Sequence, residues 1–124
     1  MMFIGTDIVD VSRIDLLRKK YNLSFLCRVF SNNEINIVQK KDIKVRSIHY
    51  SGKFAAKEAA KKALMSAGLV NNIFFKNIEI LNKYNGEPYI IINNNFNKDI
   101  IKDFKVSISH TNNYAIANTI LQLV

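Results

Sequence analysis

Residues 47–67 constrain the fold most, because they contain many good helix formers and no proline, and so predict one long helix. Gly68 follows directly and can close this helix in a left-handed conformation. Small residues recur along it at spacings of three or four, which places them on one narrow face: Gly52, Ala56, Ala59, Ala63 and Ala67. Another element of the fold can therefore approach this helix closely.

Shorter elements are expected before the long helix. Apolar residues predict a strand over residues 3–9, after which Ser12 can cap a first helix. Ser31 and Glu34 form a capping-box pattern, in which each side chain satisfies a free backbone amide, and they predict a second helix of two to three turns. Asp7 then lies near a junction between strand and helix.

Two hairpins are expected after the long helix. The apolar residues Ile78 and Ile80 and the apolar run 89–92 flank Asn85-Gly86, which is a strong signal for a tight hairpin turn. The alternating segments 106–109 and 114–121 predict a second hairpin. The intervening residues 97–104 are interpreted as one short helix.

These elements together predict an α+β fold, with one long central helix and antiparallel strands arranged in hairpins. A length of 124 residues fits one domain, residues 1–124, with a small core. A domain of this size leaves much of its surface exposed, so oligomerisation would be a natural way to bury more apolar area.

The formal charge of +8 indicates attraction to an anionic partner, which could be nucleic acid, a membrane surface, phosphate groups or an acidic protein. Composition does not choose among these partners, and an abundance of lysine, asparagine and isoleucine can also reflect coding bias. Cys27 is the only cysteine, which excludes an intramolecular disulfide and suits a reducing compartment. No apolar run reaches the roughly 20 residues that span a bilayer. We therefore expect a soluble, cytoplasmic protein without membrane insertion.

Taken singly, each candidate for a catalytic or binding residue can also have a purely structural role. Asp7 can act as a helix cap or dipole partner. Glu58 can pair with a lysine one turn away, and such exposed pairs contribute only about 0.3–0.5 kcal/mol. His110 can be a turn or packing residue. The lysines of the long helix can form a solvated face.

Read together, three segments have a more specific meaning. They are residues 5–9 (GTDIV), 53–63 (KFAAKEAAKKA) and 107–111 (SISHT), and residues 85–89 (NGEPY) add a fourth match. Their order and spacing resemble those of the holo-acyl-carrier-protein synthases, the small bacterial 4'-phosphopantetheinyl transferases. The resemblance covers nearly the whole chain.

This resemblance implies a transferase that moves the 4'-phosphopantetheine group of coenzyme A to a serine of apo-acyl carrier protein and releases adenosine 3',5'-bisphosphate. It also implies that Asp7 and Glu58 bind magnesium, with Glu58 and Lys62 as catalytic residues. Magnesium commonly takes one or two carboxylates together with phosphate oxygens and water, so the two acids suit it. The group that accepts the serine proton stays open between Glu58, acting directly or through a water, and a lysine with a lowered pKa.

The resemblance assigns contacts with coenzyme A to Lys53, Lys57, Lys62, Gly86, Pro88, His110 and Thr111. Helical geometry favours Lys62 over Lys57 as a phosphate contact. Lys62 lies one turn beyond Glu58, so both can face one pocket, whereas Lys57 lies about 100° around the axis from Glu58. The family often has arginine where this chain has Lys53, so a bidentate phosphate contact is replaced by a point charge. The family also commonly has a Gly-Thr-Gly turn after the helix, whereas residues 65–68 read MSAG.

The family's acidic carrier protein is expected to dock on basic residues of the first helices, namely Arg13, Arg18 and Arg28, with Lys19 and Lys20 nearby. The family is typically a homotrimer with active sites between subunits. Two other hypotheses stay open: a small basic nucleic-acid-binding module, which lacks the expected stacking or recognition-helix motif, and a relative that binds a carrier protein without modifying it. Binding of nucleic acid is not expected.

Overall fold

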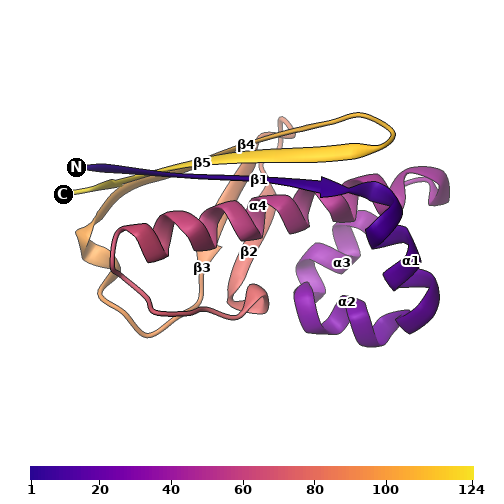
Figure 1. The fold of residues 1–124 in the computed structure, drawn as a ribbon, viewed down its shortest axis with the longest axis horizontal. Coiled ribbons are helices and arrows are strands. Elements are labelled where there is room, and N and C mark those ends of the chain that lie inside the picture. The colour runs from indigo at the N-terminus through magenta and orange to yellow at the C-terminus, as the bar shows by residue number, and fades with distance from the viewer.

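A computed structural model describes residues 1–124 and confirms the α+β fold (Figure 1). Four helices occupy mainly the first half of the chain: α1 (Val11–Tyr21), α2 (Leu23–Val29), α3 (Asn32–Gln39) and α4 (Arg46–Ser66). The five strands are β1 (Met2–Asp10), β2 (Ile78–Asn82), β3 (Pro88–Ile92), β4 (Ile101–His110) and β5 (Tyr114–Leu123). None of the helices combines the length and hydropathy that crossing a membrane requires.

The strands form two antiparallel sheets. The larger sheet has the order β1-β5-β4, and the smaller one is the β2-β3 hairpin. Strands β1 and β5 pair over their full length, from Met2 opposite Gln122 to Asp10 opposite Tyr114. The two ends of the chain therefore lie side by side (Figure 1).

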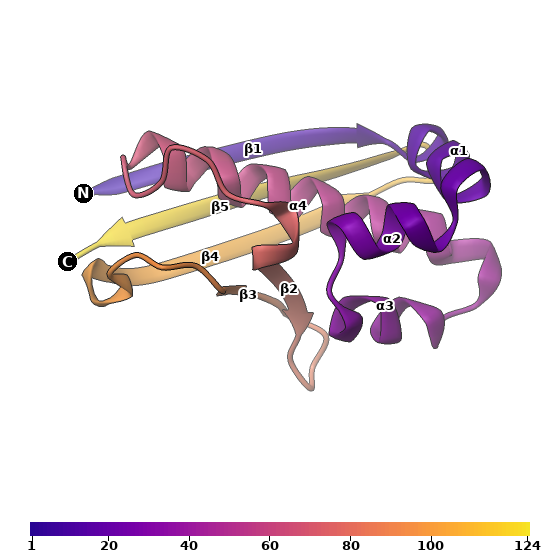
Figure 2. The same cartoon turned by 90° about the horizontal axis from the view of Figure 1, so that it is seen from below.

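Helix α4 lies along the inner face of the larger sheet, with α1–α3 and the β2-β3 hairpin on its other sides (Figure 2). Four of the five small residues on its predicted narrow face, all except Ala67, are buried. A methyl group added to Gly5 would lie 1.8 Å from the backbone oxygen of Ala59. The hydroxyl of Thr119 donates a hydrogen bond of 3.0 Å to that same oxygen. Small residues thus bring the helix backbone against β1 and β5.

Two of the three predicted helix caps are confirmed. The capping box is present at α3, where Glu34 N–H donates to the Ser31 hydroxyl and Ser31 N–H donates to the Glu34 carboxylate. Gly68 has φ +72°, and the amide of Leu69 bonds back to the carbonyl of Leu64 at 3.1 Å, which closes α4 in a Schellman motif. The cap predicted at Ser12 is wrong, because α1 already begins at Val11.

Two further expectations need correction. Residues 97–104 do not form a helix: Asn97 caps a single 3-10 turn at Lys98–Ile100, and β4 begins at Ile101. Alternation of apolar residues at 104, 106 and 108 places these side chains toward the core, and this period-2 pattern outweighs local helix propensity. The β2-β3 connection is also longer than a two-residue turn, because it spans residues 83–87, with Gly86 at φ +90°. Helix α2 was not predicted.

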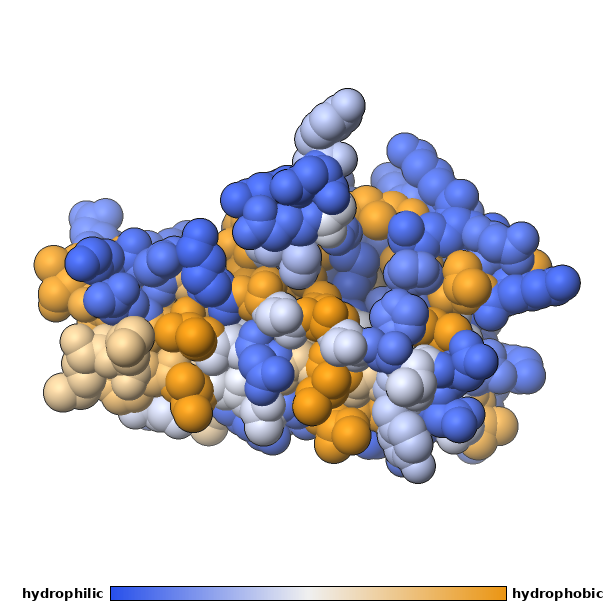
Figure 3. Space-filling model, turned by 90° about the horizontal axis from the view of Figure 1, so that it is seen from above, coloured by the Kyte–Doolittle hydropathy of each residue, from blue (hydrophilic) through white to orange (hydrophobic).

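The outer face of the larger sheet carries several exposed apolar side chains among polar ones (Figure 3). Ile4 and Ile8 of β1 are 74% and 64% exposed, and they lie opposite Ile120 and Ile116 of β5. Met2 and Tyr114 add to the same face. The Thr6–Asn118 pair lies between the two isoleucine pairs, and several large apolar side chains exposed on one face make it a candidate interaction surface.

Candidate functional site

Asp7 and Lys62 meet at the β1 edge of the larger sheet. The Asp7 side chain is only 17% exposed, and its Oδ1 lies 3.5 Å from Lys62 Nζ. Lys62 Nζ also donates to the backbone oxygen of Thr6 at 3.0 Å. Lys62 lies one turn after Glu58 on α4. The structure thus places Asp7 in contact with Lys62, one helical turn from Glu58.

The half-buried Glu58 carboxylate takes part in none of the five ion pairs of the protein. Asp7 has only the long contact with Lys62, and no third acidic, histidine or cysteine side chain completes a protein-only metal cluster. Two carboxylates with little competition from protein donors fit magnesium, which usually leaves several coordination positions to water and substrate phosphates. The residues present therefore suit the ion that the resemblance implies.

A second group of predicted residues meets at the opposite, β4 edge of the sheet. A cavity of about 350 Å³ lies between α4, the end of β4 and the β2-β3 hairpin. Its walls include Lys53, Gly86, Pro88 and His110, which are four of the seven residues assigned to coenzyme A. Since α3, α4, β4 and the hairpin all contribute, the cavity depends on the complete tertiary fold.

The ionisable side chains that line this cavity are all basic. Lys41 and His49 join Lys53 and His110 in its wall, and no carboxylate lines it. A larger hollow of about 550 Å³ near the start of α1 carries Asp10 and Asp15 instead, so it is less suited to a polyanion. The basic cavity is the better candidate for the phosphate groups of a nucleotide.

Lys53 is buried in this wall and also supports it. Its Nζ donates to the backbone oxygen of Ile80 at 2.5 Å and to Oδ1 of Asn82 at 3.2 Å. Asn82 in turn donates to the backbone oxygen of Gly86 at 3.0 Å. Burial lowers the pKa of Lys53 to about 8, although the charge of Glu34 opposes this change. Lys53 thus links α4 to the hairpin that forms one side of the cavity.

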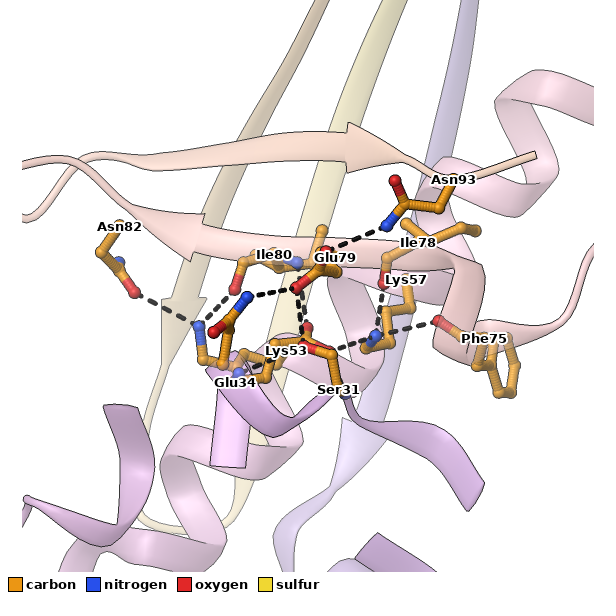
Figure 4. Close-up of polar contacts among 11 residues, drawn as sticks. Ser31, Glu34, Lys53, Lys57, Phe75, Ile78, Glu79, Ile80, Asn82 and Asn93 are labelled. Atoms are coloured by element: carbon orange, nitrogen blue, oxygen red, sulfur yellow. Dashed lines mark hydrogen bonds and ion pairs between the residues drawn. The ribbon is translucent and has the colours of Figure 1, made fainter. Parts of the chain in front are cut away.

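The structure does not bring Lys57 to either group. Its amine is fully buried and donates to Glu34 Oε1 at 2.6 Å, to the backbone oxygen of Phe75 at 2.9 Å and to that of Ile78 (Figure 4). These three acceptors match the three protons of an ammonium group. Burial lowers the pKa of Lys57, and the neighbouring Glu34 opposes this. No donor of Lys57 remains for a phosphate.

Glu34 completes the same buried network from α3. Its Oε2 accepts a hydrogen bond of 2.9 Å from the amide of Ile80, next to the Ile80 carbonyl that Lys53 holds. The adjacent Glu79 accepts from the side chains of Ser31, Asn33 and Asn93. Figure 4 shows Glu34, Glu79, Lys53 and Lys57 converging between α3, α4 and β2. The network therefore fixes the small sheet against the long helix.

The remaining predicted residues are spread over the surface. Thr111 lies in the β4-β5 turn, where its hydroxyl accepts hydrogen bonds from the amides of Asn113 and Tyr114. Arg13 and Arg28 are exposed on α1 and α2. Arg18 is partly buried: it donates to the Ser47 hydroxyl at 2.7 Å and lies over the Tyr50 ring. Of the three arginines, only Arg13 and Arg28 are fully available to a partner.

Sequence reasoning missed Lys41 and His49 as cavity residues. His49 precedes Lys53 by four positions, so the two share one face of α4, and this spacing was a usable signal. Lys41 comes from the loop after α3 and had no local signal.

The two groups lie on different sides of α4. Glu58 and Lys53 are separated by about 140° around the helix axis, and their partners come from opposite edges of the β1-β5-β4 sheet. One ligand that reached both groups of the same chain would therefore have to pass around α4.

Comparison with known proteins gives one consistent result. The profile of the 4'-phosphopantetheinyl transferase superfamily matches residues 3–119. The holo-[acyl-carrier-protein] synthase of Ehrlichia chaffeensis is 43% identical over 121 residues, which cover 95% of this chain and 94% of that protein. A crystal structure of the Bacillus anthracis holo-(acyl-carrier-protein) synthase in complex with CoA (3',5'-ADP) has a TM-score of 0.82 at 29% identity and covers both chains completely. The Helicobacter pylori enzyme in complex with coenzyme A has a TM-score of 0.76 at 31% identity and covers 96% of this chain and 99% of that one.

Proposed function

This chain belongs to the holo-acyl-carrier-protein synthases of the 4'-phosphopantetheinyl transferase superfamily, and from that premise we propose how its own residues carry out the transfer. The reaction moves 4'-phosphopantetheine from coenzyme A to a serine of apo-acyl carrier protein. The observation that most supports the proposed site is the basic cavity, which gathers residues from four separate segments at one place without a carboxylate.

In this proposal the serine oxygen attacks the phosphorus that carries the pantetheine arm. The bond between that phosphorus and the bridging oxygen breaks, and its electron pair leaves with adenosine 3',5'-bisphosphate. Lys62 faces the reacting pyrophosphate and stabilises the charge that develops on it. Glu58 accepts the serine proton through a water.

Asp7 and Glu58 are proposed to hold magnesium. When bound, the ion would neutralise the pyrophosphate and orient it for in-line attack. The partial burial of Asp7 supports this role, because a shielded carboxylate competes well for a cation. Lys62 would then give up its long contact with Asp7 and turn toward the substrate.

The nucleotide end of coenzyme A is proposed to occupy the basic cavity, with Lys53, Gly86, Pro88 and His110 in its wall. Lys57 is left out of this site because its protons are all committed inside the protein. Thr111, next to His110, is proposed as a contact at the rim. The substrate would thus run from the cavity to the carboxylate pair.

We further propose a homotrimer, in which the Asp7 edge of one subunit faces the cavity of the next. The exposed isoleucines on the outer face of the sheet, Ile4, Ile8, Ile116 and Ile120, support this assembly, since burying them would stabilise subunit contacts. The assembly would also bring together at one site the two groups that a single chain holds on different sides of α4. Arg13 and Arg28 are proposed to receive the acidic carrier protein on the surface outside this face, with Arg18 at its edge.

The assembly predicts that Ile4→Lys dissociates the trimer and reduces transfer at least about 10-fold, because it places a charge in an apolar contact. Size-exclusion chromatography with light scattering measures the mass. Phe74→Lys is the matched control, since Phe74 is similarly exposed at 76% but lies outside the sheet. A trimeric Ile4→Lys variant with normal activity would contradict the proposed interface.

Shared sites also predict complementation between inactive subunits. Mixing Asp7→Asn and His110→Ala subunits should restore part of the activity. In some sites of the mixed trimer, an intact Asp7 from one subunit then faces an intact His110 cavity from the next. A mixture no more active than its components would show that each chain builds its own site.

The transfer itself is tested with apo-acyl carrier protein, coenzyme A and magnesium, followed by mass spectrometry of the carrier protein. Addition of one phosphopantetheine, lost when a chelator is present, is the expected result. Transfer that persists unchanged in chelator would overturn the proposed metal dependence. No addition to any of several carrier proteins would contradict the proposed activity.

A further inference from the structure

His49 has an unusual position for a residue outside the predicted site. Its ring lies edge-on to that of His110, with centroids 6.0 Å apart and an angle of 67° between the rings. Both rings line the basic cavity together with Lys41 and Lys53, and the wall contains no acid to balance them. Four basic groups from α4, β4 and the loop after α3 therefore surround one space.

This environment disfavours a charge on His49 while the cavity is empty. Burial lowers the pKa of His49, and the positive charges of Lys41, His110 and Lys53 act in the same direction. Near pH 7.5 the ring is therefore mostly neutral. An anion in the cavity would reverse the electrostatic contribution.

We propose that His49 is a specificity-determining residue for coenzyme A, which takes up a proton when the 3'-phosphate of the nucleotide enters the cavity and then donates a hydrogen bond to that phosphate. This inference rests on the proposed function. In that function the pyrophosphate lies at Asp7 and Glu58, so the 3'-phosphate is the remaining anionic group of the substrate. It is a dianion above pH of about 6 and the most concentrated charge available to the cavity.

The sign of the pH dependence follows from this coupling. Binding raises the pKa of His49 above its value in the free protein, so the added affinity is fully present below the free-state pKa. It is lost as pH rises through the pKa of the complex. Lys53, whose pKa is about 8, loses its charge at higher pH, so the affinity for coenzyme A falls a second time there. Between pH 6.5 and 8.5 most of the phosphate is dianionic, and comparing His49→Phe with the wild-type protein at each pH cancels the effect of its remaining protonation.

The test is isothermal titration of the protein with coenzyme A at pH 7.5, in two buffers with different ionisation enthalpies. The difference in apparent binding enthalpy gives the number of protons taken up. We expect His49→Phe to lower this number while keeping an aromatic ring against His110. Its affinity for coenzyme A should fall about 10-fold at pH 6.5 and less than about 2-fold at pH 8.5, as for loss of one charge-assisted hydrogen bond.

Dephospho-coenzyme A is the matched ligand, because it lacks only the 3'-phosphate. Its affinity should be the same for the wild-type protein and His49→Phe. His49→Gln is a second variant that keeps a hydrogen-bond donor but cannot take up the proton. Lys40→Gln removes a nearby positive charge outside the cavity wall and should leave proton uptake unchanged.

The outcomes separate this inference from the function on which it rests. If the wild-type protein transfers phosphopantetheine but proton uptake is unchanged in both His49 variants, the role of His49 is overturned and the activity stands. Equal losses of affinity for coenzyme A and dephospho-coenzyme A would also overturn it, because the effect would not depend on the phosphate. A wild-type protein that binds no coenzyme A would overturn both.

Discussion

Glu58→Gln is expected to reduce phosphopantetheine transfer by about 10²–10³-fold or more, while leaving the fold intact. The substitution removes the charge proposed to hold magnesium and accept the serine proton, and preorganised charges at a reaction centre typically have effects of this size. Glu58 takes part in no ion pair of the protein, so its neutralisation removes no stabilising contact of that kind. Initial rates at limiting and saturating magnesium measure the effect.

Asp7→Asn tests the other proposed ligand with a different expected result. It should weaken magnesium binding, so that part of the lost rate returns at high magnesium. Asp103→Asn is the control, because Asp103 is an exposed carboxylate elsewhere on the sheet. Normal turnover of both Glu58→Gln and Asp7→Asn at limiting magnesium would show that these residues do not form a metal site.

Lys57→Met is expected to lower the free energy of unfolding by about 3–5 kcal/mol, the usual cost of breaking a buried ion pair by removing one partner. The change leaves the Glu34 carboxylate, whose side chain is fully inaccessible to solvent, without its ion-pair partner, and it removes the Lys57 hydrogen bonds to the carbonyl oxygens of Phe75 and Ile78. Urea denaturation at one fixed protein concentration measures the loss, since the concentration would affect an oligomer.

The double variant Lys57→Met/Glu34→Leu separates the ion pair from the other bonds of Glu34. It should be less destabilised than the sum of the single variants, because neither charge is left alone. Full additivity would mean that the pair contributes no coupling. Lys61→Met is the control, because Lys61 lies on the same helix and enters none of the ion pairs.

The sequence allowed much of the fold to be predicted, since several elements carry strong local signals. Residues 47–67 and the Ser31 capping box depend on helix propensity and backbone capping, which act over a few residues. The helix expected at residues 97–104 was wrong because a tertiary pairing with β5 overrides local preference there. The long pairing of β1 with β5 has no local signal at all.

The candidate site likewise contains residues that local motifs identify and residues whose positions depend on the tertiary fold. The carboxylates and the cavity residues Lys53 and His110 were named from motifs, and the structure places them at two sheet edges. The position of Lys57 could not be read from its helix, because Glu34, Phe75 and Ile78 reach it from other parts of the chain. Burial of a charge is a property of the assembled fold.

The central position of β5 has a consequence for how this chain folds. Both β1 and β4 hydrogen-bond only to β5 within the larger sheet, yet β5 follows every other element along the chain. During synthesis, β1 therefore stays an unpaired edge, and the sheet-facing side of α4 stays uncovered, until residues 114–123 emerge from the ribosome. Contacts between residues so distant in sequence also slow folding. The nascent chain should consequently be at greatest risk of aggregation just before its last strand is made.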